Sequence, residues 1–249
     1  AVRPGSWCTP RPGFAACRTV VPRQYGPGVS TDPALAALPR LGVLAQHDAF
    51  LTLVRRNPVI RQILLRTPRL DAPGWYLTAG AVFQTVWNGL SGRPPTAGIA
   101  DYDLFYFDPS DLSYEAEDRV IRRAAELFGD LADEYGARVE VRNEARVHLW
   151  YEQKFGVPGV PFTSTEDAID HFAATTCCLG LRAEPDGAVT VYAPHGFADL
   201  FSLVVRPNPV LAPRSVYETK AARWQAEWPT LRVLPWPVAE LPVAAERVV

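Results

Sequence analysis

Residues 77–108, LTAGAVFQTVWNGLSGRPPTAGIADYDLFYFD, constrain the fold of this chain more than any other stretch. A short apolar run breaks at Gly80 and Ala81 and continues with an amphipathic, helical spacing of apolar residues. After a loop rich in Gly and Pro, the chain resumes as an apolar segment that opens with Asp101 and Asp103. The stretch therefore predicts a strand, a tight turn, a helix, a loop and a second strand, in that order.

The two acids at the head of the second strand point to a metal site. Side chains alternate along a strand, so Asp101 and Asp103 project from one face, roughly 6 to 7 Å apart at the backbone. Neighbouring carboxylates repel each other unless a cation joins them, and hard oxygen ligands suit Mg²⁺. Upstream, Gly80 permits a tight turn into a helix whose first N–H groups can hold a phosphate. An isolated Asp-x-Asp pair is usually a solvated strand start, but this context favours the metal-binding interpretation.

Five sequence blocks carry a family resemblance, which covers about residues 47–237. They are AGAVFQTVWNGL, IADYDLFYFD, RNEARVHLWYEQKFG, APHGFADLFSLVVRPNP and a late RW…WP…PW. In this order they resemble a poorly characterised bacterial nucleotidyltransferase-like family within the superfamily typified by DNA polymerase β. The resemblance implies an α+β fold, in which a small mixed β-sheet carries helices and a C-terminal hairpin with further helices is added. The superfamily usually has Gly-Ser or Gly-Gly where this chain has Gly80-Ala81, so phosphate contact would rely on backbone amides here.

The resemblance also implies an activity. A nucleotidyltransferase of this kind uses Mg²⁺ (or Mn²⁺) to move an NMP from an NTP co-substrate to an acceptor, with release of pyrophosphate. Asp101 and Asp103 would bind the metal, and superfamily members place a third carboxylate on the neighbouring strand. Glu140, in a strand predicted over residues 137–141, fits that role by position. An exposed acid on an edge strand is an equally weighted interpretation of Glu140, and Glu144 is a competing third carboxylate.

Two further residues are candidates for substrate contact, each with a structural alternative. His148, in a strand predicted over residues 145–151, would orient a phosphate or a nucleophile because histidine titrates near neutrality. A hydrogen-bonded structural histidine is the favoured alternative. Asp199, in a helix predicted over residues 197–203, would contact the nucleotide, whereas an ion pair with Arg206 is the favoured alternative.

The remaining pattern predicts helices and one hairpin around this centre. Asn57-Pro58 is a typical cap and first-turn pair, and Ser113 and Gly136 bracket a long amphipathic segment. Trp87 is interpreted as a core residue rather than a base-stacking platform. The other expected elements are helices over residues 46–56, 58–66, 114–135 and 214–228 and a hairpin over residues 176–183 and 188–192.

Length and composition favour one folded unit. A chain of 249 residues with 48% hydrophobic residues can bury a full core. We expect a nucleotidyltransferase-like domain over residues 34–237, an irregular basic arm rich in Pro and Gly over residues 1–33, and a C-terminal extension over residues 238–249. The four cysteines, Cys8, Cys17, Cys177 and Cys178, form neither a disulfide framework nor a zinc pattern, and buried free thiols are expected for the adjacent pair Cys177 and Cys178.

Charge and hydropathy bear on partners and location. The formal net charge of −2 disfavours RNA as the acceptor and leaves a small molecule or a protein as the favoured one. No secretory signal pattern is present, and no apolar run approaches the length of a membrane span, so a cytoplasmic protein without membrane insertion is expected.

Two other functions remain open from the sequence. A non-catalytic nucleotide- or partner-binding protein would keep the fold without transferring the nucleotide, and the Gly80-Ala81 departure leaves room for it. A metal-dependent phosphoesterase would need more His or Asp ligands beside Asp101 and Asp103 than the four histidines of the chain offer.

Overall fold

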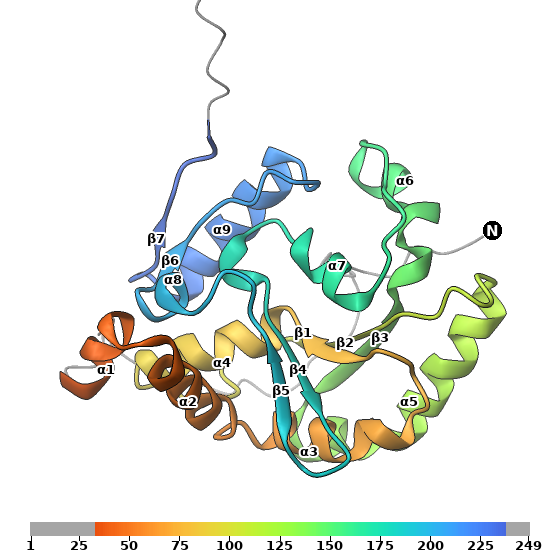
Figure 1. Ribbon diagram of the computed structural model, residues 1–249, viewed down its shortest axis with the longest axis horizontal. Coiled ribbons are helices and arrows are strands. Elements are labelled where there is room, and N and C mark those ends of the chain that lie inside the picture. Colours follow the sequence, from red (N-terminus) through yellow and green to blue (C-terminus); the bar gives the residue numbers. More distant parts are fainter. Residues whose placement is uncertain (1–32, 238–249) are drawn as a thin grey trace, which may run out of the picture.

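The centre of the fold is a five-stranded mixed sheet with the strand order β3-β2-β1-β4-β5 (Figure 1). The computed structural model describes residues 33–237, so the predictions for the N-terminal arm, for Cys8 and Cys17 and for the C-terminal extension lie outside the described residues. Strand β2 is parallel to β3, whereas the pairs β1–β2, β1–β4 and β4–β5 are antiparallel. The strands are β1 (Tyr76–Thr78), β2 (Asp101–Tyr106), β3 (Arg138–Asn143), β4 (Gly180–Ala183) and β5 (Val189–Tyr192). This mixed sheet with its helices confirms the predicted α+β fold class.

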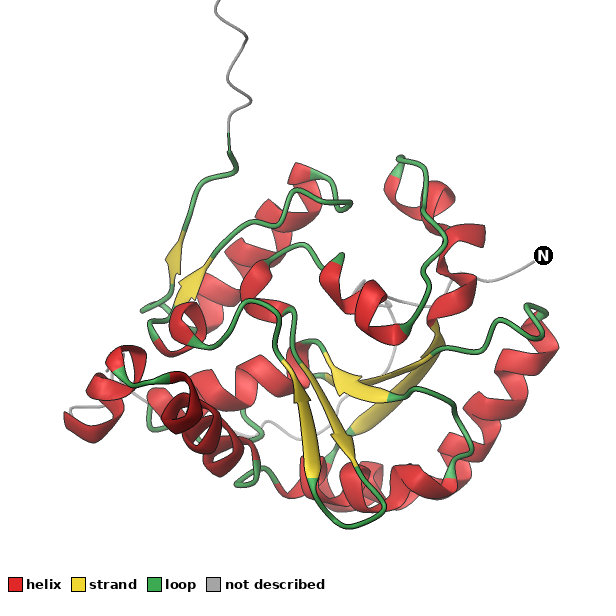
Figure 2. Cartoon of the chain, viewed as in Figure 1, coloured by secondary structure: helices red, strands yellow, loops and turns green. Residues whose placement is uncertain are grey.

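Helices cover both faces of the sheet (Figure 2). Helices α3 and α5 lie on one side, whereas α7 and α9 lie on the other (Figure 1). A second, two-stranded sheet pairs β6 (Val204–Val205) with β7 (Arg232–Val233) and ties the C-terminal segment to the domain. The helices are α1 (Pro33–Ala37), η1 (Leu38–Arg40), α2 (Val43–Val54), α3 (Pro58–Arg66), η2 (Thr67–Arg69), α4 (Gly80–Leu90), α5 (Tyr114–Tyr135), η3 (Glu144–Leu149), α6 (Tyr151–Phe155), α7 (Thr165–Asp170), η4 (Thr175–Cys177), α8 (Ala198–Phe201) and α9 (Arg214–Glu227).

Side-chain caps set the ends of the helices that flank the site. The Asn57 side chain accepts hydrogen bonds from the first turn of α3 and donates one, of 2.9 Å, to Thr85 Oγ1 on α4. Ser113 caps the start of α5, and Gly136 ends that helix with a left-handed φ of 65°. These caps confirm the predicted starts of α3 and α5 and the predicted end of α5.

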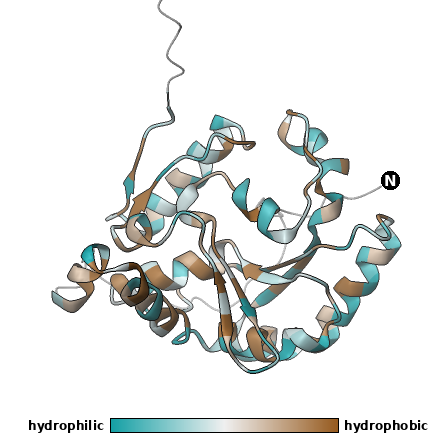
Figure 3. Ribbon diagram, viewed as in Figure 1, coloured by the Kyte–Doolittle hydropathy of each residue, from teal (hydrophilic) through white to brown (hydrophobic). Residues whose placement is uncertain are grey.

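An aromatic cluster joins α4 to the C-terminal part of the chain. Trp87 is fully buried, which confirms its interpretation as a core residue, and its ring lies 6.0 Å from that of Trp224 and 5.6 Å from that of Trp228. Trp228 Nε1 donates a 3.1 Å hydrogen bond to Asn88 Oδ1. Figure 3 shows hydrophobic residues concentrated on the sheet and on the inward sides of the helices. The cluster packs α9 against α4, and the Phe83–Trp224 contact, at 5.1 Å between ring centroids, extends it towards the start of α4, where the candidate site lies.

Two sequence predictions of strands are wrong. Residues 145–151 form η3 and the start of α6 rather than a strand, because Asn143 turns the chain: its side chain accepts a 3.1 Å hydrogen bond from the Ala145 amide and bonds both backbone groups of Asp108. Cys177 belongs to η4, and β4 begins only at Gly180. Cys177 and Cys178 are buried free thiols, as predicted.

No helix among residues 33–237 is long and apolar enough to cross a membrane.

Candidate functional site

The turn from β1 into α4 forms one wall of the site. Ala79 connects the two elements with a φ of 55° and a ψ of −140°, a conformation that L residues rarely adopt and that often marks a functional position. The turn brings the N-terminus of α4, at Gly80, to the sheet, and the first N–H groups of a helix have no acceptor within the helix. Ala81, also predicted as a phosphate-binding residue, is fully buried in the core and, unlike Gly80, does not line the cavity at this turn.

Three carboxylates lie on adjacent strands beside this turn. In the parallel β2–β3 pair, Asp103 is the direct partner of Glu140, and Asp101 lies two residues earlier on β2. Because the side chains of residues i and i+2 share a face of the sheet, all three acids project to one side. The structure therefore brings together the two acids of the Asp-x-Asp strand and the candidate third carboxylate.

These residues line a small cavity of about 80 Å³. Helix α9 contributes Lys220 and Arg223 to the lining of the cavity, so two cations share it with the acids. The lining residues are Ala79, Gly80, Phe83, Gln84, Asp101, Asp103, Glu140, Phe172, Ala173, Ala174, Cys177, Lys220, Arg223 and Trp224.

The electrostatics of the cavity disfavour an ionised Asp103. Its side chain is buried, and burial raises its pKa to about 7, with further contributions from the charges of Asp101 and Glu140. Lys220 and Arg142 act in the opposite direction, but they do not outweigh burial. A cation bound between the carboxylates would remove this penalty.

The donor set suits a hard divalent cation, but part of it is already paired. Arg138 forms ion pairs of 3.3 Å with Asp101 and 2.7 Å with Glu140. As these side chains are positioned, residues 33–237 contain no group of three His, Cys, Asp or Glu side chains that would hold a metal ion. The Arg138 side chain is 57% exposed, so it can leave the carboxylates without a buried rearrangement. The residues therefore fit Mg²⁺ by chemistry once Arg138 moves away.

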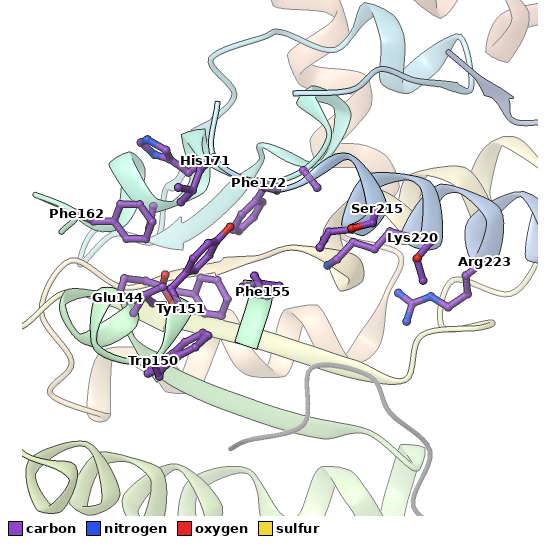
Figure 4. A pocket seen from close by; sticks show the side chains of 18 residues that line it. Glu144, Trp150, Tyr151, Phe155, Phe162, His171, Phe172, Ser215, Lys220 and Arg223 are labelled. Atoms are coloured by element: carbon purple, nitrogen blue, oxygen red, sulfur yellow. The ribbon is translucent and has the colours of Figure 1, made fainter. Parts of the chain in front are cut away.

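A larger cavity of about 390 Å³ opens beside the first (Figure 4). Phe172, Ala173, Lys220 and Arg223 line both cavities. The remaining lining residues of the larger cavity are Phe105, Glu144, Val147, Trp150, Tyr151, Phe155, Phe162, Ala168, His171, Leu211, Ala212, Ser215, Val216 and Thr219. We call this space the aromatic cavity.

Two candidates from the sequence lie elsewhere. Asp199, on α8, forms a bidentate ion pair with Arg206, with distances of 2.6 and 3.2 Å, as the structural alternative for this residue predicted. His148, on η3, is half-buried and lines neither cavity. The structure does not bring either residue to the carboxylates.

The sequence reasoning missed the cations and the strained turn. Lys220 and Arg223 are three residues apart on α9 and therefore share a helix face, which is a signal that the sequence contained. Lys220 is also one of only two lysines in the chain. Ala79 carried no such signal, because a positive φ at alanine is visible only in coordinates.

Comparisons with known proteins agree with this geometry. A protein-family profile described as nucleotidyltransferase matches residues 66–233. A solution structure described as a CCA-adding enzyme head domain is similar to this chain, with a TM-score of 0.60 and 25% sequence identity, over 75% of this chain and 95% of that one. No curated protein matches the sequence. The two similarities support nucleotidyl transfer as the general activity, with a nucleoside triphosphate as substrate.

Proposed function

Because the chain belongs to the nucleotidyltransferase family, we propose that it is a Mg²⁺-dependent enzyme that moves an NMP from an NTP to an acceptor and releases pyrophosphate. The observation that carries this proposal is the pairing of Asp103 with Glu140 across β2 and β3, with Asp101 two residues away and the start of α4 beside them.

The carboxylates of Asp101, Asp103 and Glu140 would hold the metal. When bound, Mg²⁺ neutralises charge on the triphosphate and on the attacking oxygen. The backbone amide of Gly80, at the positive end of α4, would bind the terminal phosphates. Lys220 and Arg223 would bind phosphate oxygens from the opposite wall, which compensates for the hydroxyl that Ala81 lacks.

The test compares two aspartates of the same chain. Asp103→Ala should reduce Mg²⁺-dependent pyrophosphate release from each of the four NTPs by at least about a thousandfold, because electrostatic stabilisation is a large part of such catalysis. Asp199→Asn is the matched control, since Asp199 lies outside the cavity, and it should keep the wild-type rate. Circular dichroism checks that both variants fold. Equal turnover by wild type and Asp103→Ala would refute the proposal.

The ion pairs of Arg138 favour a second candidate, a non-catalytic nucleotide-binding protein, because they engage two of the three carboxylates. Titration calorimetry with each NTP and Mg²⁺ separates the two candidates. Binding without pyrophosphate release, with any acceptor, supports the non-catalytic reading.

A further inference from the structure

We propose that the aromatic cavity is the acceptor site, and that it takes a small molecule whose aromatic ring carries a hydrogen-bonding group at one end and a nucleophilic hydroxyl at the other. This inference rests on the proposed function and names the class of acceptor that the function leaves open.

The first argument is the order of groups along the sheet. Strand β1 is antiparallel to β2, with Thr78 opposite Asp103, so the chain continues from β1 to Gly80 at the Asp101 end of β2. Phe105, which lies on the same face of β2 as the two acids, lines the aromatic cavity at the other end. The phosphate-binding turn, the carboxylates and the aromatic cavity therefore follow one another in a line.

This order matches in-line transfer. In phosphoryl transfer the attacking and leaving oxygens lie on opposite sides of the phosphorus atom. With the terminal phosphates at Gly80 and the α-phosphorus opposite Asp103, the pyrophosphate leaves towards the turn and the acceptor attacks from the side of the aromatic cavity. A hydroxyl of a molecule bound there would face the α-phosphorus.

The second argument is the wall of the cavity. Rings of Trp150, of α6 and of the segments around α7 line it, and the rings of Tyr151 and Phe155 lie 4.6 Å apart at their centroids. Figure 4 shows these rings on one side, with Ser215, Lys220 and Arg223 of α9 on the other. Aromatic side chains favour stacked or edge-to-face contacts with another ring. A volume of about 390 Å³ lies in the range of small-molecule sites.

The third argument is Glu144. It lines the cavity and is only 3% exposed, and its Oε1 atom has no hydrogen-bond partner among the described residues. Buried polar atoms are almost always paired, so an unpaired one that lines a cavity indicates a polar group on the ligand. Burial, followed by the charges of Asp103 and Glu117, raises the pKa of Glu144. A neutral carboxyl can both donate and accept, which suits a ring hydroxyl.

The walls and the charge favour a small molecule over a polymer. Lining residues come from the sheet, from η3 and α6, from the α7 region and from α9, so the ligand is surrounded from several directions. The net charge of −2 gives no general attraction for RNA.

The reaction forms a bond between the acceptor oxygen and the α-phosphorus and breaks the bond from that phosphorus to the α,β-bridging oxygen. The products are an NMP ester of the acceptor and pyrophosphate, and the hydroxyl proton leaves to solvent.

Binding is tested first, without NTP, so that its result does not depend on catalysis. The probes are 2-(4-hydroxyphenyl)ethanol, 2-phenylethanol, which lacks the ring hydroxyl, and 2-cyclohexylethanol, which lacks the aromatic ring. Heteronuclear NMR titration of the ¹⁵N-labelled chain should show shifts at residues of the aromatic cavity. The first probe should bind about tenfold more tightly than the second, because only it satisfies Glu144. Equal affinity for all three probes, or shifts outside the cavity, would overturn the proposal.

Variants distinguish a specific loss of binding in the aromatic cavity from a loss of folding. Glu144→Leu should remove the preference for the ring hydroxyl, whereas Glu144→Gln should keep it. Should Glu144→Leu fail to fold, Thr219→Trp replaces it: this exposed lining residue of α9 would fill the mouth and abolish binding. Ala222→Trp, exposed on the same helix but outside the cavity, should bind as wild type. Unchanged binding by Thr219→Trp contradicts the proposal.

Transfer is tested second, with α-labelled NTP, Mg²⁺ and each probe. Label should appear on 2-(4-hydroxyphenyl)ethanol in wild type and not in Thr219→Trp. Transfer to RNA or to a polypeptide that these alcohols do not inhibit would overturn the acceptor assignment and leave the proposed function standing. If the alcohols bind but no pyrophosphate is released with any acceptor, both the acceptor assignment and the proposed function are refuted.

Discussion

Replacing Asp103 by Asn should stabilise the metal-free protein at neutral and alkaline pH. Asp103 has its pKa raised from 3.8 to about 7, chiefly by burial, so the unfolded chain loses its proton at lower pH than the folded chain. Its contribution to stability is therefore complete below about pH 4 and is lost as the pH rises towards 7. An Asp pKa that moves from 3.8 to about 7 corresponds to about 4 kcal/mol. Asn has a similar shape and is neutral at every pH. The free energy of unfolding of the Asp103→Asn variant therefore does not fall as the pH rises.

The assay is urea unfolding, followed by tryptophan fluorescence, between about pH 4 and pH 8 with a chelator present. The free energy of unfolding of Asp103→Asn should match that of wild type near pH 4 and exceed it by up to about 4 kcal/mol at pH 8. Asp130→Asn is a control of opposite sign, because the Arg66 guanidinium, 2.6 Å away, lowers the pKa of Asp130. This variant should be less stable than wild type at pH 8 and equally stable in acid.

Mg²⁺ provides the second half of the test. Binding to the folded state alone raises the free energy of unfolding. Added Mg²⁺ should therefore stabilise wild type at pH 8 and have a much smaller effect on Asp103→Asn. A variant that is less than about 1 kcal/mol more stable than wild type at pH 8 without metal would refute the reasoning about Asp103.

Three further substitutions test other parts of the structure. Arg138→Ala should tighten Mg²⁺ binding severalfold in titration calorimetry, because Asp101 and Glu140 lose their competing ion pairs; unchanged affinity would mean that these acids do not bind the metal. Asn57→Ala should lower the free energy of unfolding by about 2 to 3 kcal/mol, since the cap of α3 and its buried link to α4 are both lost. Gly136→Ala should cost about 1 kcal/mol, because the left-handed φ of 65° strains alanine; a neutral effect in urea unfolding would contradict that reading.

The parts of the fold that depend on local pattern could be predicted from the sequence. The helix from Gly80, the strand from Asp101 and the caps at Asn57 and Ser113 all follow from spacing and capping chemistry within a few residues. The neighbouring position of Glu140 came from the family resemblance. These predictions agree with the structure because no distant contact overrides the local preference.

The parts that depend on distant contacts could not be predicted. The alternating apolar residues after Asn143 indicate a strand, but the hydrogen bonds between the Asn143 side chain and the backbone of Asp108, 35 positions earlier, turn the chain into η3. The same turn places Glu144 in the aromatic cavity, whose lining also includes Lys220 of α9. A cavity formed by segments this far apart in sequence has no local signature.

The ion pairs of Arg138, which favour the non-catalytic candidate, are equally expected of an enzyme in its metal-free state. Three acids on one face of two adjacent strands repel each other, and the nearest exposed cation reduces that repulsion. Such a pair contributes little, because Arg138 is 57% exposed and water screens its charge. A divalent cation carries twice the charge and binds carboxylates directly, so it displaces Arg138 at modest cost. Asp103 forms no ion pair with Arg138 and is the most deeply buried of the three acids. The largest electrostatic penalty therefore lies at Asp103, where a bound metal would relieve it.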